Sequence, residues 1–237
     1  QAGHGDVIRS TALWQRSETS ATTEWTQLAI TGSYDHTIRV WNVKDPDVAT
    51  DEDRCISILS HGFPVEALCL MESQDPDVPV WLLSVGGTTM KVWNPISGQC
   101  NSTVSTQHRK TITSLQAVVR SNLSDDTKTK SLAWRILTSS LDGLLQFHSW
   151  DPAAGTLDHL YSTALDYAIS SVVADPTGDR LAIGTTTGEV VVKVKGPSTV
   201  ATKRAREPFA GTYSFFQRGM NADADAGDYT VASQGKK

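Results

Sequence analysis

The chain has 237 residues, with 21 basic and 26 acidic side chains and a formal net charge of −5. An acidic balance argues against a bare nucleic-acid-binding domain, which is usually basic. The sequence contains no run of 18 apolar residues and no signal peptide, so we expect no membrane span. Because the first residue is Gln1 and not Met, we expect the chain to be a piece of a longer protein.

The first predicted elements form a hairpin. Residues Gln27–Thr31 and Thr37–Trp41 alternate between apolar and polar side chains, as strands with one buried face do. Between them, Gly32–Asp35 has turn-forming residues, and an Asp side chain can accept hydrogen bonds from nearby backbone N–H groups. We also expect a preceding strand at Val7–Trp14.

The same strand–turn–strand pattern recurs three times along the chain. Its copies are Trp81–Trp93, Arg135–His148 and Arg180–Lys193. A strand-like segment precedes each copy, at Val65–Met71, Ile112–Val119 and Ile169–Ala174. Self-similarity at a period of about 50 residues, with three or four short strands in each unit, is the signature of propeller blades.

This pattern resembles the WD40 family, most strongly in the first unit. The resemblance implies an all-β fold, a WD40 β-propeller of which about four blades are present. We expect them to be the C-terminal part of a seven-bladed propeller, with about three blades upstream and sheet faces that invite association. The expected domains are the blades over residues 1–195 and a linker-like, partly disordered extension over residues 196–237.

In that family a loop His, a strand Ser or Thr, a turn Asp and a strand Trp are hydrogen-bonded within a blade. The first unit carries all of them, the second has Gly87 where Asp is expected, the third has His148 in place of Trp, and the fourth keeps only the strand pattern. The resemblance therefore implies a structural network at His4, Thr31 or Ser33, Asp35, Trp41, His61, Trp93, His108 and Asp142.

Four longer connections interrupt the repeats. Three lie between the first and second strands of a blade, and an acidic one follows a third strand. Such connections open on one face of a propeller, where they are either tolerated surface variation or a partner-binding decoration. They are Arg16–Glu24, Glu72–Pro79, Ser121–Ser131 and Lys44–Arg54.

The C-terminal extension begins where Gly196–Ser198 breaks the last strand. A basic cluster at Lys203, Arg204 and Arg206 is either a solvated linker or a contact to RNA phosphate or to a nuclear import receptor.

The segment Gly211–Gly219 is dense in aromatic residues, so we expect it to dock on the propeller or on a partner. Its candidate contact residues are Tyr213, Phe215, Phe216 and Arg218. The segment beginning at Asn221 resembles a calcium loop but has Ala226 and Ala232 where Gly and Glu are required.

No catalytic motif is present. The sequence lacks phosphate-binding loops, a nucleophile elbow and zinc-ligand spacing, and its loop histidines are explained by the blade pattern. Cys55, Cys69 and Cys100 are an odd number without CxxC spacing, which predicts reduced thiols in an intracellular protein. We therefore expect a protein that is not an enzyme and has no cofactor, no metal and no small-molecule substrate.

A finer resemblance is to the U3 small nucleolar RNA-associated protein 15 family. Short motifs distributed over residues 3–219 carry it, and the loop insertions are those of a divergent member. The motifs are Gly3–Ser10, Gly32–Trp41, Leu83–Trp93, His108–Leu115, Ser139–Gly143, Leu165–Ser171, Ala182–Gly188 with Val192–Lys193, and Gly211–Gly219.

The resemblance implies a nucleolar, non-enzymatic scaffold of the small-subunit processome that acts in pre-rRNA processing and 40S ribosome biogenesis. Its implied partners are other WD40 and helical subunits, the 5′ external transcribed spacer of pre-rRNA and the U3 small nucleolar RNA particle, with no membrane partner. In some organisms the family also assists ribosomal RNA gene transcription. Members of the family carry a C-terminal helical domain that joins the other subunits, and we expect no such domain in the sequence given. The alternative is a general WD40 adaptor, such as a substrate-recruiting subunit of a ubiquitin ligase.

Overall fold

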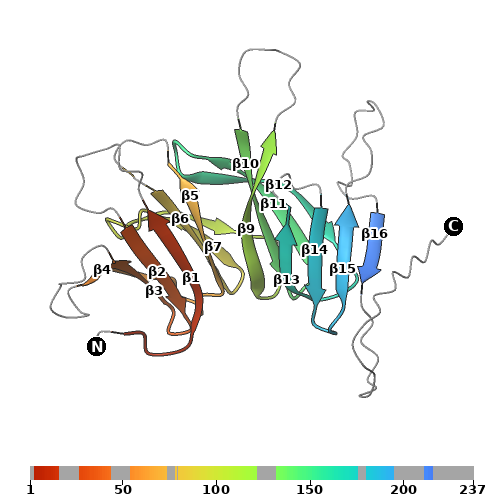
Figure 1. Ribbon diagram of the computed structural model, residues 1–237, viewed down its shortest axis with the longest axis horizontal. Coiled ribbons are helices and arrows are strands. Elements are labelled where there is room, and N and C mark those ends of the chain that lie inside the picture. The colour runs from red at the N-terminus through yellow and green to blue at the C-terminus, as the bar shows by residue number, and fades with distance from the viewer. Residues whose placement is uncertain are drawn as a thin grey trace, which may run out of the picture.

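The computed structural model contains four antiparallel sheets of four strands each, which we call blades one to four (Figure 1). The structure describes residues 3–15, 27–43, 54–73, 78, 80–121, 132–175, 180–194 and 211–215. The expected all-β fold and partial WD40 propeller are confirmed.

Each blade is built from four strands that are consecutive in the chain. Blade one contains β1 (Ile8–Gln15), β2 (Gln27–Ser33), β3 (Thr37–Asn42) and β4 (Cys55–Ser60). Blade two contains β5 (Ala67–Glu72), β6 (Val80–Gly86), β7 (Thr89–Trp93) and β8 (Cys100–Ser105). Blade three contains β9 (Ile112–Ser121), β10 (Leu132–Ser140), β11 (Leu144–Asp151) and β12 (Thr156–Ala164). Blade four contains β13 (Ile169–Ala174), β14 (Arg180–Thr185), β15 (Val190–Val194) and β16 (Gly211–Phe215).

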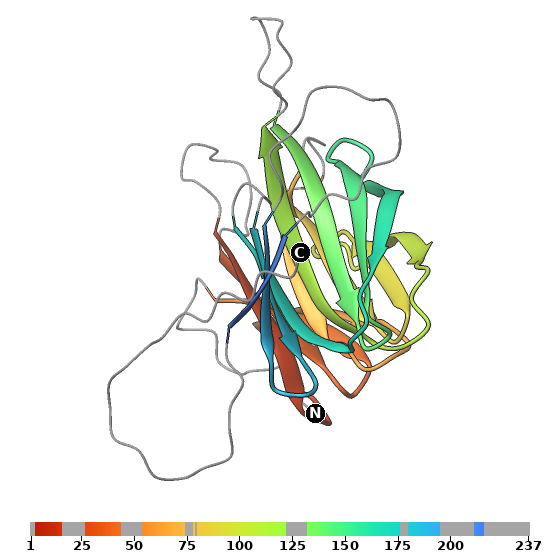
Figure 2. The same ribbon diagram turned by 90° about the vertical axis from the view of Figure 1, so that its right-hand side faces the viewer.

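The four blades follow one another in an arc. Figure 2 shows blades one and four, in red and blue, on the same side of the middle two. The first strands of successive blades are neighbours, and hydrogen bonds link them: Ser10 Oγ accepts from Leu68 N, and Ser114 Oγ accepts from Val172 N, both at 3.0 Å. The strands β1, β5, β9 and β13 therefore line the inner side of the arc.

Apolar side chains fill the space between adjacent blades. The alternation along each strand gives both faces of the middle blades an apolar character, since a blade between two others buries both faces. One core cluster, including Leu28, Ile38 and Leu82, joins blades one and two. A second, around Leu83, joins blades two and three, and a third, around Leu137, joins blades three and four.

The hairpin turns between the second and third strands share a left-handed residue. Gly87, Gly143 and Gly188 have φ of +55°, +82° and +86°, and the first blade has His36 with φ of +69°. Positive φ is unfavourable for a residue with a Cβ atom, so glycine is the usual choice here.

Strand β16 lies beyond residue 195, the expected end of the blades. It pairs with β15 in blade four, with Tyr213 opposite Val192 and Phe215 opposite Val190. Backbone pairing thus holds this part of the aromatic segment against the propeller. The assignment of residues 1–195 and 196–237 to two separate units stays a prediction.

The connections Arg16–Glu24, Glu72–Pro79, Lys44–Arg54 and Ser121–Ser131 lie wholly or mostly outside the described residues. In the described part of the chain, no helix has the length and apolarity needed to cross a membrane. Cys55, Cys69 and Cys100 are free thiols, and burial raises the pKa of Cys69 to about 11.

Candidate functional site

The best-formed polar cluster of the described residues lies in blade one and joins its entry loop to the hairpin of the second and third strands. His4 in the entry loop contacts Asp35 Oδ2 through Nδ1 at 2.8 Å and Thr31 Oγ1 through Nε2 at 2.7 Å. The indole of Trp41 donates to the same Thr31 hydroxyl at 2.9 Å. With Nδ1–H donated to the carboxylate, Nε2 is the acceptor, so the Thr31 hydroxyl donates to His4 while it accepts from Trp41.

Asp35 is held as a carboxylate at the turn. Thr37 donates to Oδ1 from its hydroxyl at 2.6 Å and from its backbone N at 2.9 Å, and Gly5 N donates to Oδ2 at 2.9 Å. Partial burial alone would raise the pKa of Asp35, but these hydrogen bonds and the one from His4 outweigh it and hold the pKa well below its usual range. Ser33, the other candidate hydroxyl, instead donates to the Asp6 carbonyl at 3.0 Å.

Blade two contains only part of this network. Trp93 donates to the buried Ser84 hydroxyl at 2.8 Å. His61 is buried, and neither ring nitrogen has a hydrogen-bond partner of good geometry among the described residues. Burial lowers the pKa of His61 to about 4, and the nearby charge of Lys91 acts in the same direction. The Ser84 backbone raises this pKa, but its effect is smaller.

The structure places Gly86, and not the expected Gly87, at the aspartate position, because Gly86 precedes the left-handed Gly87 as Asp35 precedes His36. A Cβ at Gly86 would lie 3.0 Å from His61 Nδ1, so the absence of a side chain there leaves this histidine without a carboxylate.

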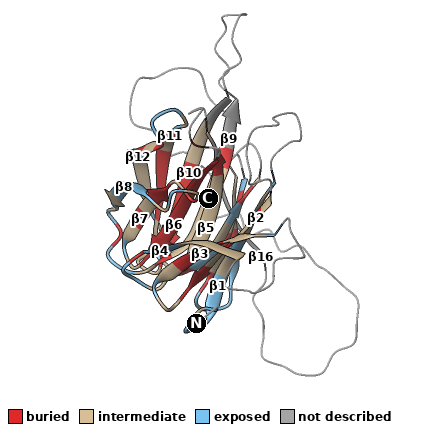
Figure 3. Ribbon diagram, turned by 90° about the vertical axis from the view of Figure 1, so that its left-hand side faces the viewer, coloured by how far each residue is buried: buried red, intermediate tan, exposed pale blue. Residues whose placement is uncertain are grey.

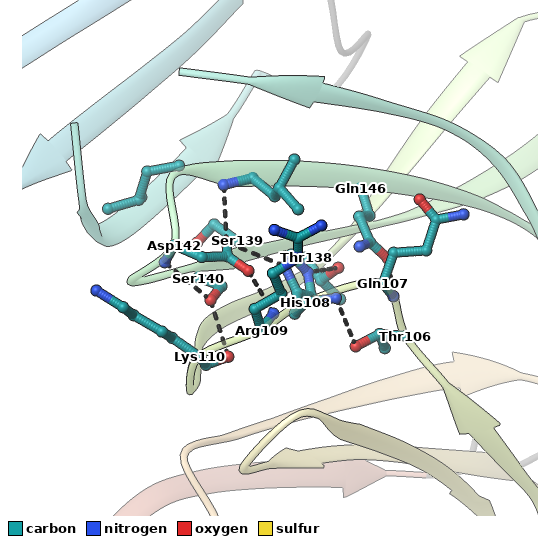
Figure 4. Close-up of polar contacts among 12 residues, drawn as sticks. Thr106, Gln107, His108, Arg109, Lys110, Thr138, Ser139, Ser140, Asp142 and Gln146 are labelled. Atoms are coloured by element: carbon teal, nitrogen blue, oxygen red, sulfur yellow. Dashed lines mark hydrogen bonds and ion pairs between the residues drawn. The ribbon is translucent and has the colours of Figure 1, made fainter. Parts of the chain in front are cut away.

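Blade three keeps the histidine and the aspartate (Figure 4). His108 Nε2 lies 3.0 Å from Thr138 Oγ1, and its Nδ1 lies 3.5 Å from Asp142 Oδ1. Backbone N–H groups of Arg109 and Leu144 donate to the same carboxylate at 2.6 and 2.9 Å. These bonds lower the pKa of Asp142 against the effect of its burial, while burial lowers the pKa of His108.

His148 takes the place of the tryptophan in blade three. It is buried and pairs across the sheet with Ile136 and, on the other side, with His159. Burial, and then the charges of His159 and His108, lower its pKa to about 4. In blade four the corresponding residue is Lys193, and its turn is closed by the hydroxyls of Thr185 and Thr187, which lie 2.7 Å apart.

Three partners in these networks are not evident from the sequence motifs: Ser84, Thr138 and Gln146, whose Oε1 accepts from Gln107 N at 3.3 Å. One signal identifies Thr138. It precedes Asp142 by four residues, as Thr31 precedes Asp35.

The tail candidates are only partly placed. Tyr213 and Phe215 belong to β16 through their backbone pairing. The remaining candidates lie outside the described residues: Lys203, Arg204, Arg206, Phe216 and Arg218.

Among the residues that the structure describes, these networks link loops and strands within single blades. Each loop histidine belongs to a different blade and contacts groups of its own blade. Within the described ranges, no group of three or more His, Cys, Asp or Glu residues is placed to hold a metal ion. The arrangement is suited to fixing loops and strands in place.

Several curated proteins with similar sequences share one name. The chain is 27% identical over 211 residues to the U3 small nucleolar RNA-associated protein 15 homolog of Gallus gallus, covering 87% of this chain and 34% of that protein. The homolog of Xenopus tropicalis is 28% identical over 82% of this chain and 32% of its own length. Under a different name, Protein SLOW WALKER 1 of Arabidopsis thaliana is 27% identical over 78% of this chain and 35% of its own length.

No protein-family model matches the chain. The chain spans about a third of the length of the curated relatives it matches. The resemblance inferred from the sequence motifs is confirmed by these similarities, which extend over most of the chain: this protein is a divergent relative of the U3 small nucleolar RNA-associated protein 15 homologs.

Proposed function

We propose that this protein is a non-enzymatic scaffold subunit of the small-subunit processome, acting in pre-rRNA processing and 40S ribosome biogenesis. The observation that carries the proposal is the similarity over 82–90% of the chain to several proteins that bear the name U3 small nucleolar RNA-associated protein 15 homolog. The proposal includes a nuclear, nucleolar location and, as in some organisms of the family, support of ribosomal RNA gene transcription.

The proposed partners are the other WD40 and helical subunits of that assembly, the 5′ external transcribed spacer of pre-rRNA and the U3 small nucleolar RNA particle. Contacts through protein subunits suit a net charge of −5 better than extensive contact to bare RNA, because RNA phosphates attract a basic surface. The basic cluster Lys203, Arg204 and Arg206, together with the aromatic segment around Tyr213, is the proposed place for a local RNA or partner contact.

Blade architecture supports a scaffold role in a physical sense. Short turns, fixed by Asp35 in blade one and Asp142 in blade three, keep one edge of the arc rigid, and rigid loops lower the entropic cost of binding a partner. A general WD40 adaptor would use the same architecture. The identity of the bound partner therefore distinguishes a processome subunit from such an adaptor.

Depletion of the protein in its own cells tests the proposal. Loss of a processome subunit should raise the uncleaved pre-rRNA and lower mature small-subunit rRNA, while large-subunit rRNA is maintained. Re-expression of the unaltered protein should restore the ratio, and a version with Lys203, Arg204 and Arg206 all changed to Glu should restore it less well if the cluster contacts RNA. An unchanged rRNA ratio after depletion, with accumulation of a specific protein substrate instead, would favour the ubiquitin ligase adaptor.

A further inference from the structure

Blades one and three each hold the carboxylate of their turn aspartate with the same pair of groups. In blade one, Asp35 Oδ2 contacts His4 Nδ1 at 2.8 Å and accepts from the next backbone N–H, that of Gly5, at 2.9 Å. Blade three repeats the arrangement around Asp142, with the Arg109 N–H at 2.6 Å and the histidine Nδ1 at 3.5 Å. A loop histidine and the N–H group that follows it thus form a receptor for one carboxylate.

Blade two has the same pair of groups and no carboxylate. Its loop histidine, His61, is 1% exposed, and neither ring nitrogen has a hydrogen-bond partner of good geometry among the described residues. The N–H of Gly62, which follows it, also makes no hydrogen bond with a described residue. A buried polar group without a partner keeps the full cost of its desolvation, so an acceptor at this place would stabilise the loop.

The turn of blade two cannot provide this carboxylate itself. Gly86 holds the aspartate position, and a Cβ there would lie 2.5 Å from the Pro64 carbonyl oxygen, which is too close for any side chain. Besides burial, the groups that lower the pKa of His61 are Lys91 and His36, which are both basic. The local charge therefore favours an anion, and a carboxylate at this place has to come from outside the turn.

The entry loop of blade two is held at its ends and free in the middle. The backbone N–H groups of His61 and Val65 donate to the hairpin of blade one at 2.9 and 3.0 Å, while Gly62 and Phe63 between them are exposed. Figure 3 shows loops at this lower edge of the sheets as exposed. A Cβ built on Gly62 meets no described atom within 4 Å. A carboxylate can therefore approach beside Gly62, and a small outward movement of the loop gives it access to the buried ring.

Phe63 gives this place an apolar border. The residue is 47% exposed, and a Cβ built on Gly87 would lie 3.1 Å from its ring, so the ring rests on the glycine turn and remains accessible from outside. An exposed aromatic ring beside a carboxylate receptor fits an acidic residue that has an apolar neighbour. RNA would need several phosphate contacts to bind, whereas the corresponding groups in blades one and three hold a single carboxylate.

We propose that blade two binds an acidic residue of a partner protein. The partner's carboxylate accepts hydrogen bonds from the Gly62 N–H and the His61 ring, and an apolar neighbour of the acidic residue packs on Phe63. The carboxylate takes the place that Asp35 and Asp142 have in the adjacent blades. The inference does not depend on which assembly the protein joins, so it stands apart from the function proposed above.

Histidine NMR signals of the full-length protein test the proposal. The probes are a capped tripeptide of leucine, glutamate and phenylalanine, and the same peptide with glutamine in place of glutamate. The glutamate peptide should shift the His61 signal saturably and raise the pKa of His61 from about 4 toward the ordinary value of about 6.5, because a carboxylate favours the charged ring. The glutamine peptide should bind about 10-fold more weakly, since hydrogen bonds to a charged acceptor are stronger.

Two internal controls and one variant locate the contact. His61→Gln assigns the signal, and the His108 signal should not move, because that histidine already has an aspartate. Phe63→Ser should weaken binding of the glutamate peptide about 5-fold through the loss of apolar contact. Val7→Ser, at a residue that is 59% exposed on the entry loop of blade one, should bind the peptide like the parent.

Equal binding of the glutamate and glutamine peptides, or no response of His61 to either, would overturn the proposal. Unchanged affinity of the Phe63→Ser variant would overturn it as well. A short uridine oligonucleotide that shifts the His61 signal at a lower concentration than the glutamate peptide would also overturn it, and would identify the place as a phosphate contact to RNA.

Discussion

The imidazole of His148 lies nearly perpendicular to that of His159, with ring centroids 5.5 Å apart. His148 occupies the position in blade three that Trp41 and Trp93 occupy in the first two blades. Because His148 is buried and His159 is exposed, protonation of the buried ring would place a positive charge where solvent cannot screen it. The replacement of tryptophan by histidine therefore makes this interface sensitive to acid.

We predict that the free energy of unfolding falls between pH 6.5 and pH 4. The pKa values of His61 and His148 are about 4 in the folded chain, and an unfolded histidine has a pKa of about 6.5. In this window the unfolded state binds more protons, so stability is fully present above pH 6.5 and is lost as the pH falls toward 4. The loss amounts to about 3 kcal/mol at most for each histidine. Urea unfolding at several pH values measures it.

A substitution separates histidine titration from other acid effects. His148→Phe keeps an aromatic ring in the interface and removes the titrating group. The number of protons taken up on unfolding, which sets the slope of stability against pH, should therefore decrease by about one in this window. The carboxylates contribute elsewhere: the lowered pKa values of Asp35 and Asp142 make their stabilisation decline only below about pH 4. Stability that is flat from pH 7 to 4 in the parent would show that the two buried histidines do not have lowered pKa values.

The hydroxyl of Thr31 is predicted to be the key atom of the first-blade network. Thr31→Val removes the acceptor of Trp41 and the partner of His4 at once, and should destabilise the chain by about 2 kcal/mol because two partly buried polar groups lose a hydrogen bond. Thr31→Ser keeps the hydroxyl and should cost less than about 1 kcal/mol. Equal losses for the two variants in chemical unfolding would show that the methyl group, and not the hydroxyl, is important.

The hairpin glycines offer a matched pair of substitutions. Gly143 and Gly188 have nearly the same positive φ, so alanine has the same backbone cost of about 1 kcal/mol at both. A Cβ at Gly143 would lie 2.5 Å from the Leu165 carbonyl oxygen, whereas nothing among the described residues lies within 4 Å of one at Gly188. Gly143→Ala should therefore lower the melting temperature clearly more than Gly188→Ala, and the reverse order in a thermal melt would contradict the structure.

The sequence was sufficient for the repeated hairpins because alternation and turn residues are local signals. Gln27–Thr31 and Thr37–Trp41 fall within β2 and β3, and the strand expected at Ile169–Ala174 has the bounds of β13. The WD40 resemblance then placed the blades in the right order, since consecutive hairpins in such repeats pack as neighbours.

The outer strands could not be located in this way. Strand β8 has a weak pattern (CNSTVS), because an edge strand buries little of either face. Strand β16 follows a break at Gly196–Ser198, so only pairing with the free edge of β15 defines it, and that is a long-range interaction. The histidine that replaces tryptophan in β11 can be found by alignment of the repeats, but its burial depends on packing between blades two and three.

Crosslinking and sequencing of the RNA bound to the tagged full-length protein in cells tests the proposed processome role, with co-purifying proteins identified from the same sample. We expect reads in the 5′ external transcribed spacer of pre-rRNA, or of U3 small nucleolar RNA, together with other processome subunits. Absence of ribosomal RNA precursors and of those subunits, with a ubiquitin ligase or a signalling complex recovered instead, would contradict it.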